Sequence, residues 1–290
     1  WITASYLLIS GLKMATFPSV AFIGGGNMAN ALVSGMLAQG CPTERVHVVE
    51  VLDTLQEQWR ARSVSVSGAP DQTLQQKDVW IFAVKPQQMR EVVMQCRPWL
   101  TPNTLVISIA AGISIESLGK WLGDAVKPFG NIVRCMPNTP ALVGAGVTGM
   151  SAPATTSAED RKRATALLST VGEVVWVDND KAIDAVTALS GSGPAYVFLF
   201  LESLIKGGLA LGLSEQQSRD LALSTLAGAT KLAQQSTESP SVLRERVTSK
   251  GGTTAAALDV FGQQGFGTTV VQAMAAADRR AAELSIEFGK

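Results

Sequence analysis

The stretch SVAFIGGGNMANALVSGML at residues 19–37 decides the fold that we expect for the rest of the chain. Its first part, VAFI, is an apolar run short enough for a buried parallel strand. Three glycines interrupt it, and apolar residues then return with helical spacing. A strand, a glycine turn and a helix in this order are typical of a pyrophosphate site. Gly24 would permit a tight turn, Gly26 would let the backbone approach the ligand, and the helix beginning near Asn27 would offer unpaired N–H groups at its positive end. Ala29 takes the third small position, so the pattern is G-x-G-x-x-A.

A glycine turn without any ligand would have the same local pattern, so the remaining strands are needed to decide. Apolar runs typical of strands follow at residues 45–51, 64–66, 79–84, 104–109, 131–135, 144–150 and 173–177, and helical segments separate many of them. Such alternation predicts an α/β fold with a doubly wound, mostly parallel sheet of Rossmann type, whose ligands bind at the carboxyl ends of the strands. The glycine turn lies at these carboxyl ends, and so do three further stretches: AVKP at 83–86, IAAG at 109–112 and MPNTP at 136–140. Their convergence on one rim of the sheet favours a dinucleotide site.

The strand pattern stops near residue 178. Apolar and alanine-rich helical segments fill the remainder, at residues 182–212, 214–235, 241–247, 253–262 and 267–288. We therefore expect a dinucleotide-binding domain at 18–177 and an all-helical C-terminal domain at 178–290. Residues 1–17 are expected to be a disordered or upstream extension, with Met14 as the natural start.

The first helical segment contains SGSGPAY at residues 190–196, followed by VFLFLESLI. Small residues there would let two helices touch, and Pro194 would kink the helix. The segment is apolar nearly all round, which in a water-soluble protein requires burial on every side. A small helical domain can scarcely provide that cover alone, so we expect a second subunit to do so.

Composition and charge restrict the classes of partner. Apolar residues make up 46% of the 290 residues and charged residues 17%, as in globular proteins. Because 24 basic residues balance 24 acidic ones and no basic run stands out, we expect neither nucleic acid nor a membrane as a partner. The three cysteines are far apart, which argues against disulfides and zinc sites and favours a cytoplasmic location.

A second candidate site lies in VTSKGGTTAAAL at residues 247–258. Backbone N–H groups and the hydroxyls of Ser249, Thr253 and Thr254 gather before an alanine-rich helix, a place that suits a carboxylate. The alternative is a threonine that simply caps the helix after a loop. That alternative leaves the second glycine, Gly252, without an explanation.

Six motifs, in this order and at this spacing, resemble pyrroline-5-carboxylate reductase: FIGGGNMANAL, FAVKPQ, ISIAAG, RCMPNTPALV, LSGSGPAYVF and TSKGGTTAAAL. The resemblance runs from about residue 19 to the C-terminus, and MPNTP, SGSGPAY and GG-x-T make it specific. It implies reduction of 1-pyrroline-5-carboxylate to L-proline by NADPH or NADH, the last step of proline synthesis. It also implies an obligate homodimer with interlocked helical domains, which in this family often assembles into larger rings such as a decamer.

The resemblance also implies site residues. For the cofactor these are Ile23, Gly24, Gly25, Gly26, Asn27 and Met28 of the turn, Ala83, Val84, Lys85 and Pro86 beside it, and Ile109, Ala110 and Ala111 near the nicotinamide. For the substrate they are Ser249, Gly252, Thr253 and Thr254, with Thr254 as the catalytic candidate close to the ring nitrogen. Lys250 stands where many members have proline, and its charge either attracts the substrate carboxylate or faces solvent.

The reaction needs no dedicated base, because hydride transfer to a protonated imine depends mainly on holding two reactants at reacting distance. The only histidine, His47, falls within the second strand and is interpreted as a sheet residue. Without it no Ser-His-Asp set can form, and the scattered acids predict no metal site.

Glu50 follows the second strand, where an acidic side chain usually accepts hydrogen bonds from the ribose 2′- and 3′-hydroxyls. A 2′-phosphate would be repelled by its charge, and Asp53 adds to that charge. We therefore expect NADH to be used at least as well as NADPH. The alternative is that Glu50 turns to solvent or pairs with Arg45.

Two other functions fit the first domain. A hydroxyacid dehydrogenase would need a positioned acid or base, for which Lys206 is the only candidate, in surroundings unlike that family's motif. A cofactor-sensing protein without turnover would need a further binding domain or tail, and the sequence offers none.

Overall fold

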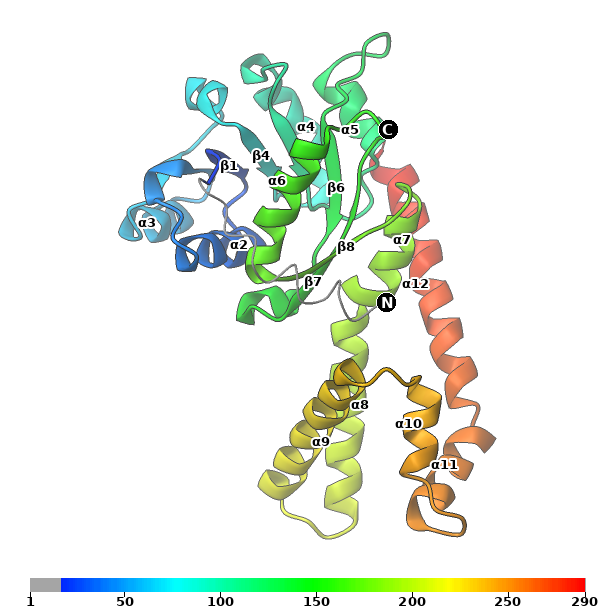
Figure 1. Ribbon diagram of the computed structural model, residues 1–290. Coiled ribbons are helices and arrows are strands. Elements are labelled where there is room, and N and C mark those ends of the chain that lie inside the picture. The colour runs from blue at the N-terminus through cyan, green and yellow to red at the C-terminus, as the bar shows by residue number, and fades with distance from the viewer. Residues whose placement is uncertain (1–16, 290) are drawn as a thin grey trace. The chain divides into compact units, whose positions relative to one another are not determined.

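The computed structural model describes residues 17–289, so the upstream extension expected at residues 1–17 lies, except for Phe17, outside the described residues. Contacts along the chain divide it into two compact units (Figure 1). Unit 1 contains the residues up to Gly191 together with those from Ala277 onward, and unit 2 is Ser192–Ala276. The domain boundary expected near residue 178 therefore falls inside unit 1, which continues to Gly191 and also includes the residues from Ala277 onward.

Unit 1 is built on one eight-stranded sheet in the order β3-β2-β1-β4-β5-β6-β7-β8. The strands are β1 (Val20–Ile23), β2 (Val46–Val49), β3 (Ser65–Ser67), β4 (Val79–Phe82), β5 (Leu105–Ser108), β6 (Ile132–Met136), β7 (Gly146–Ser151) and β8 (Gly172–Trp176). All neighbours are parallel except β6 and β7, which pair antiparallel. The register pairs Val20 with both Val46 and Val79, so the glycine turn after β1 begins at the middle of the sheet edge. The predicted doubly wound, mostly parallel sheet is confirmed.

Helices cover both faces of this sheet (Figure 1). They are α2 (Asn27–Ala38), α3 (Asp53–Ala61), α4 (Pro86–Cys96), α5 (Ile115–Leu122), α6 (Ala158–Leu168) and α7 (Ala182–Val186). Successive strand residues alternate between two cores: Val20 and Phe22 pack in the core that contains residues of α2 and α6, and Ala21 and Ile23 in the core that contains residues of α4 and α5. Burial on both faces explains why these strands are apolar throughout rather than alternating.

Local signals set where several helices begin. Ser114 and Ser157 cap α5 and α6 by accepting hydrogen bonds from the backbone N–H groups of Ser117 and Asp160. Pro86 begins α4, where a missing N–H carries no cost. This proline also ends the AVKP loop, so the same residue releases the chain from the sheet edge and begins the next helix.

Unit 2 is entirely helical and contains α8 (Gly193–Ala210), α9 (Glu215–Gln235), α10 (Pro240–Arg246), α11 (Thr253–Gln263) and the first part of α12 (Phe266–Phe288). Gly208 of α8 meets Ser218 of α9 so closely that a Cβ on the glycine would lie 2.6 Å from the serine Oγ. The ring of Phe266 lies 6.2 Å from that of Phe200 and 5.2 Å from that of Phe261.

The segment predicted as one helix over 182–212 is interrupted. α7 passes into a π-helical turn at Thr187–Gly191, and α8 then begins with Pro194 in its first turn. Pro194 therefore begins a helix instead of kinking one, so the predicted kink is wrong. The reason is that proline is tolerated in the first helical turn, where its missing N–H would be unpaired in any case.

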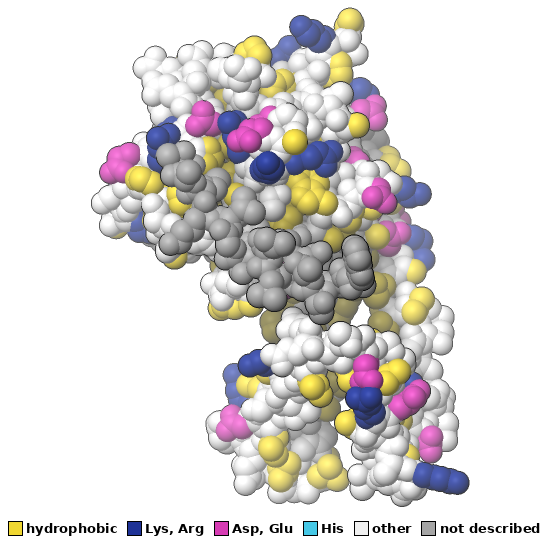
Figure 2. Space-filling view, in the orientation of Figure 1, with side chains coloured by type: hydrophobic (Ala, Val, Ile, Leu, Met, Phe, Trp, Pro, Cys, Tyr) yellow, Lys and Arg dark blue, Asp and Glu magenta, His cyan; other side chains and the backbone are white. Residues whose placement is uncertain are grey.

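Much apolar surface of unit 2 is uncovered within one chain. None of the eighteen residues of α8, all of them described, is buried, and Phe198 and Leu199 are 63% and 65% exposed. Hydrophobic side chains reach the surface of the helical unit at several places in Figure 2. By length and composition, Ala182–Ala210 is the one described segment that could cross a membrane, with a mean hydropathy of 1.3. A helix covered by a second subunit has the same composition, so this finding alone is weak support for a span.

Candidate active site

Gly24 brings two of the predicted cofactor loops into contact. Its φ is +98°, a conformation that favours glycine, and its N–H donates to the Val49 carbonyl at 2.9 Å. A Cβ at this position would lie 2.8 Å from the Ala83 carbonyl oxygen and 2.9 Å from Cγ1 of Val84. The glycine turn and the AVKP loop can therefore pack together only if residue 24 lacks a side chain.

The next part of the turn is open. Gly26 is the N-cap of α2, and no side chain in the described part of the chain caps this helix. A Cβ built on Gly26 would meet no described atom within 4 Å, and Gly26 and Asn27 are both exposed. The first N–H groups of α2 therefore face free space, which is the arrangement that a pyrophosphate needs. These residues fit a dinucleotide.

Glu50 lies directly beside this turn. It is 8% exposed, its Oε2 accepts from the Gly25 N–H at 2.8 Å, and its Oε1 accepts from the Leu52 N–H at 2.9 Å. The alternative in which Glu50 turns outward to solvent is therefore wrong. An ionised carboxylate has about four acceptor positions. Two are used here, so the group retains capacity for ribose hydroxyls.

The third predicted cofactor loop, IAAG, adjoins the end of β4. Ile109 donates from its backbone N–H to the Phe82 carbonyl at 3.2 Å, and Ala110 is buried. Gly112 has a φ of +71°, and a Cβ there would lie 2.9 Å from Cβ of Leu284 near the end of α12. Close packing against a helix explains this glycine. The three predicted cofactor loops thus lie at one edge of the sheet, where the parallel strands end.

Two side chains that the sequence did not single out hold segments at this edge of the sheet: Asn138 holds MPNTP, and Trp59 holds the glycine turn. Asn138 of MPNTP accepts from the Val147 N–H at 2.9 Å and donates to the Ser190 carbonyl at 3.1 Å. Trp59 of α3 donates from its indole Nε1 to the Gly25 carbonyl at 3.1 Å. The sequence showed the MPNTP motif that contains Asn138. It does not reveal that the Asn138 amide connects this motif with Val147 and Ser190. Nothing in the sequence marks Trp59 as a partner of the glycine turn, 34 positions before it.

The predicted substrate residues come together at the start of α11, within unit 2. Gly252 is the N-cap of this helix, and its N–H donates to the Ser249 carbonyl at 3.0 Å. A Cβ on Gly252 would lie 2.5 Å from the Ser249 Oγ and 3.2 Å from the Ser249 carbonyl oxygen, so the glycine lets this serine lie against the start of the helix. Thr253 and Thr254 are the first two helical residues, so the alternative of a capping threonine is wrong. The uncapped N–H groups here, beside a serine hydroxyl, can donate hydrogen bonds to a carboxylate.

Other candidates are less suited to chemistry. Lys206 pairs with Glu202 of the same helix at 2.7 Å, and both side chains are more than half exposed. Burial raises the pKa of the Cys96 thiol to about 12, so it stays protonated. His47 lies in β2 between the hydroxyls of Ser65 and Ser67, as a sheet residue should. Among the described residues no group of three or more His, Cys, Asp and Glu side chains could hold a metal ion.

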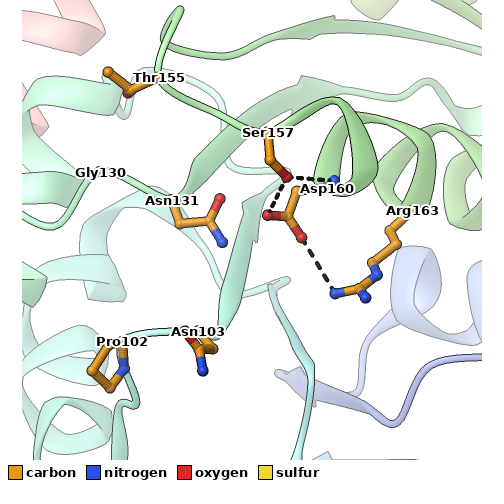
Figure 3. Close-up of a pocket in the computed structure, with 8 residues that line it drawn as sticks. All are labelled: Pro102, Asn103, Gly130, Asn131, Thr155, Ser157, Asp160 and Arg163. Atoms are coloured by element: carbon orange, nitrogen blue, oxygen red, sulfur yellow. Dashed lines mark hydrogen bonds and ion pairs between the residues drawn. The ribbon is translucent and has the colours of Figure 1, made fainter.

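A polar pocket lies elsewhere in unit 1 (Figure 3). Asn103 and Asn131, just before β5 and β6, line it together with Ser157, Asp160 and Arg163. Asp160 is already paired there, at 2.8 Å with the Ser157 hydroxyl and at 3.4 Å with Arg163. Because this pocket is at the amino ends of parallel strands, it is at the opposite edge from the glycine turn and is not part of the dinucleotide site.

A doubly wound sheet with an open glycine turn, an uncapped helix behind it and a carboxylate after β2 defines a nicotinamide-dependent oxidoreductase of Rossmann type. A family model described as NADP oxidoreductase, coenzyme F420-dependent, matches residues 19–112, and one for pyrroline-5-carboxylate reductase dimerisation matches residues 180–284.

Individual proteins are similar over nearly the whole chain. A pyrroline-5-carboxylate reductase of Pseudomonas aeruginosa is 44% identical over 278 residues, 94% of this chain and 99% of the relative. One of Pisum sativum is 36% identical, covering 92% of this chain and 96% of the relative. The chain belongs to the pyrroline-5-carboxylate reductase family, and it is an NAD(P)-dependent oxidoreductase.

Solved structures agree with this assignment. A pyrroline-5-carboxylate reductase from Coxiella burnetii has a TM-score of 0.85 at 37% identity, covering 93% of this chain and 99% of that one. The Plasmodium falciparum enzyme with NADP bound has a TM-score of 0.81 at 30% identity, covering 92% and 98%.

Proposed function

We propose that the protein reduces the cyclic imine 1-pyrroline-5-carboxylate to L-proline, the last step of proline biosynthesis, with a nicotinamide cofactor at the glycine turn. The observation that carries the cofactor assignment is the uncapped N-terminus of α2 behind the open Gly26 position. It would receive the pyrophosphate through backbone N–H groups. Ala83–Pro86 and Ile109–Ala111 would line the remainder of the cofactor site.

The substrate residues are proposed to orient the imine. The N–H groups at the start of α11 and the Ser249 hydroxyl would hold the carboxylate, since a helix N-terminus stabilises negative charge. Thr254, half-buried in the first turn, would place its hydroxyl at the ring nitrogen. The cofactor, when bound, would supply a hydride to C5 of the imine, whose already protonated nitrogen becomes the secondary amine of proline. Holding the reacting atoms in position lowers the barrier of such a reaction.

Cofactor choice is proposed to depend on Glu50. Its carboxylate is held beside the turn by two backbone N–H groups and keeps acceptor capacity for ribose hydroxyls. A 2′-phosphate at the same place would be repelled by that charge. We therefore propose that NADH is used at least as well as NADPH.

The assembly is proposed to be an obligate homodimer formed through unit 2, active in the cytoplasm without nucleic-acid or membrane partners. The uncovered apolar surface of α8 and the match to the dimerisation family support this proposal. Acidic and basic side chains are interspersed on the face shown in Figure 2, which is not the footprint of a polyanion-binding protein. Larger rings, including a decamer, would be built from such dimers.

The activity is tested by mixing the protein with NADH or NADPH and 1-pyrroline-5-carboxylate while following nicotinamide absorbance. The same measurement with a panel of cyclic imines and keto acids separates this function from hydroxyacid dehydrogenation. We expect oxidation of the cofactor with the five-membered imine and production of proline. Cofactor binding without turnover of any compound in the panel would instead indicate a sensor.

A further inference from the structure

The backbone N–H and C=O of Gly25 are each held by a side chain of the second strand-helix unit. Its N–H donates to Glu50 at 2.8 Å, and its carbonyl accepts from the Trp59 indole at 3.1 Å. Both contacts are buried. Gly25 lies between Gly24, which packs on Ala83, and Gly26, which caps α2. The two contacts therefore restrain the peptide groups on both sides of Gly25, and with them the turn.

Trp59 is itself fixed in place. It is 3% exposed and belongs to the core beneath α2. The guanidinium of Arg62 stacks on its ring, 4.9 Å from the centroid, and also donates to the Ser34 hydroxyl at 3.0 Å and to the Asn30 side chain. Ser34 and Asn30 are residues of α2, so the indole is tied to the same helix whose N-terminus faces the proposed pyrophosphate position.

The glycine at position 25 has a steric rather than a conformational cause. Its φ is not in the positive range, unlike that of Gly24. A Cβ there would collide with the Trp59 Nε1 and would lie 3.1 Å from Cγ1 of Val48 and 3.2 Å from the Glu50 Oε2. The middle glycine of the triplet is thus explained by the indole that bonds to it.

We propose that Trp59 is a positioning residue for the nicotinamide cofactor. Its indole N–H fixes the Gly25 carbonyl, so the turn already has its binding conformation before the cofactor arrives, and less ordering is required on binding. This inference rests on the proposed cofactor site at the glycine turn. Trp59 acts through the Gly25 carbonyl and does not itself touch the reacting atoms.

The primary test is Trp59→Phe, which keeps an aromatic ring but removes the donor. The dissociation constants for NADH and NADPH, measured by calorimetric titration without substrate, should both rise about fivefold, the effect of one hydrogen bond. The KM for the imine should be unchanged. In the cofactor-free protein the Gly25 amide should exchange its hydrogen faster than in the wild type.

Trp80→Phe is the matched control. Trp80 is also buried, in the core on the other face of the sheet from Trp59, and its indole donates to the Leu74 carbonyl at 3.0 Å instead of to the glycine turn. This variant loses an equivalent bond and should lower thermal stability, but its cofactor dissociation constants should equal those of the wild type. An equal loss of affinity in both variants would overturn the proposal, because it would show a general effect of stability.

A double-mutant cycle tests the steric link. Gly25→Ala should weaken cofactor binding more than tenfold because its Cβ meets the indole nitrogen, and the same substitution in a Trp59→Phe background should cost markedly less. Additive losses, or unchanged binding in Trp59→Phe, would refute Trp59 as the positioning residue while leaving the cofactor site intact. A wild type that binds neither nucleotide would refute the cofactor site and this inference together.

Discussion

Arg134 donates from its guanidinium Nη2 to the carboxylate of Asp184 at 3.0 Å, inside unit 1. Its Nη1 donates to the carboxylate of Asp180 at 2.9 Å, and Asp180 in turn accepts from the Ile115 N–H at 3.1 Å. The arginine side chain is 3% exposed. One residue of β6 therefore connects the sheet with α7 and with the start of α5.

Replacing Arg134 by Met should lower the free energy of unfolding by about 3–5 kcal/mol, because the two acids would be left without their buried partner. Urea denaturation of both proteins measures this difference. Arg163→Met is the control, since Arg163 is partly exposed in its pair with Asp160, and loss of such a pair changes stability by about 1 kcal/mol or less. Equal changes in the free energy of unfolding for the two substitutions would show that the buried network contributes no more to stability than an exposed ion pair.

His47 should give the protein a pH-dependent stability. Burial lowers its pKa below the usual value near 6.5, so the folded state favours the neutral ring. As pH falls through about 6.5, the unfolded chain takes up a proton that the folded protein does not, and stability falls. Above that pH both states are neutral and the contribution is complete.

Thermal unfolding between pH 7.5 and 5.5 tests this expectation. Because His47 is the only histidine, His47→Gln should remove most of the decline in that interval. The Ser67 hydroxyl donates to the Ala69 carbonyl, so it accepts from the His47 Nε2–H. The Ser65 hydroxyl can then donate to Nδ1, and both nitrogens of the neutral ring are hydrogen-bonded. The same decline in the variant would assign it to other groups.

The sequence predicted the fold of unit 1 well because its signals are local. A run such as VAFI is buried on both sides wherever it pairs, and the glycine turn follows it directly. The interruption at Thr187–Gly191 could not be foreseen, since it depends on contacts between distant residues. Asn138 bonds the Ser190 carbonyl, and Gly191 lies against Met136.

The candidate site shows the same limit. Gly24 and Gly26 were recognisable from their spacing, and Glu50 from its place after a strand. The side chains that hold the turn were not recognisable. Glu50 accepts from the Gly25 N–H across 25 positions of the chain, and Trp59 donates to the Gly25 carbonyl across 34. A sequence pattern names the residues near a ligand more readily than the side chains that hold those residues in place.

Thr254→Ala should reduce turnover at least tenfold with little loss of stability. The hydroxyl is proposed to lie beside the reacting nitrogen, where a small change of geometry is costly. Steady-state kinetics and thermal unfolding measure the two effects. Thr230→Ala on exposed α9 removes a hydroxyl that bonds only to its own helix, and it should leave both kcat and KM unchanged. Wild-type kinetics in Thr254→Ala would reject its role.

Light scattering at micromolar concentration should give the mass of a dimer or of a multiple of it. Leu199→Glu should weaken that association, because this side chain of α8 is 65% exposed in one chain and would carry a charge into an apolar interface. Val126→Glu in unit 1, at a position 96% exposed, is the control and should keep the wild-type mass. A well-folded wild-type monomer would contradict the dimer.

Glu50 offers the sharpest test of cofactor choice, because its carboxylate both braces the turn and carries charge. Glu50→Ala should weaken binding of NADH. For NADPH the same substitution has two opposing effects, because it removes the hydrogen bonds that hold the turn and also the charge that repels the 2′-phosphate. Glu50→Gln separates the two contributions, since the amide oxygen can still accept from one of the two backbone N–H groups while the charge is gone.

In Glu50→Gln we expect the ratio of kcat/KM for NADPH to that for NADH to rise about tenfold over the wild type, because removing one negative charge near a 2′-phosphate is worth about 1 kcal/mol or more at close range. Asp53→Asn removes a nearby exposed charge that makes neither backbone contact, and we expect a clearly smaller change. Steady-state kinetics with both nucleotides decide the matter. A wild type that strongly prefers NADPH would mean that Glu50 only braces Gly25 and does not read the ribose.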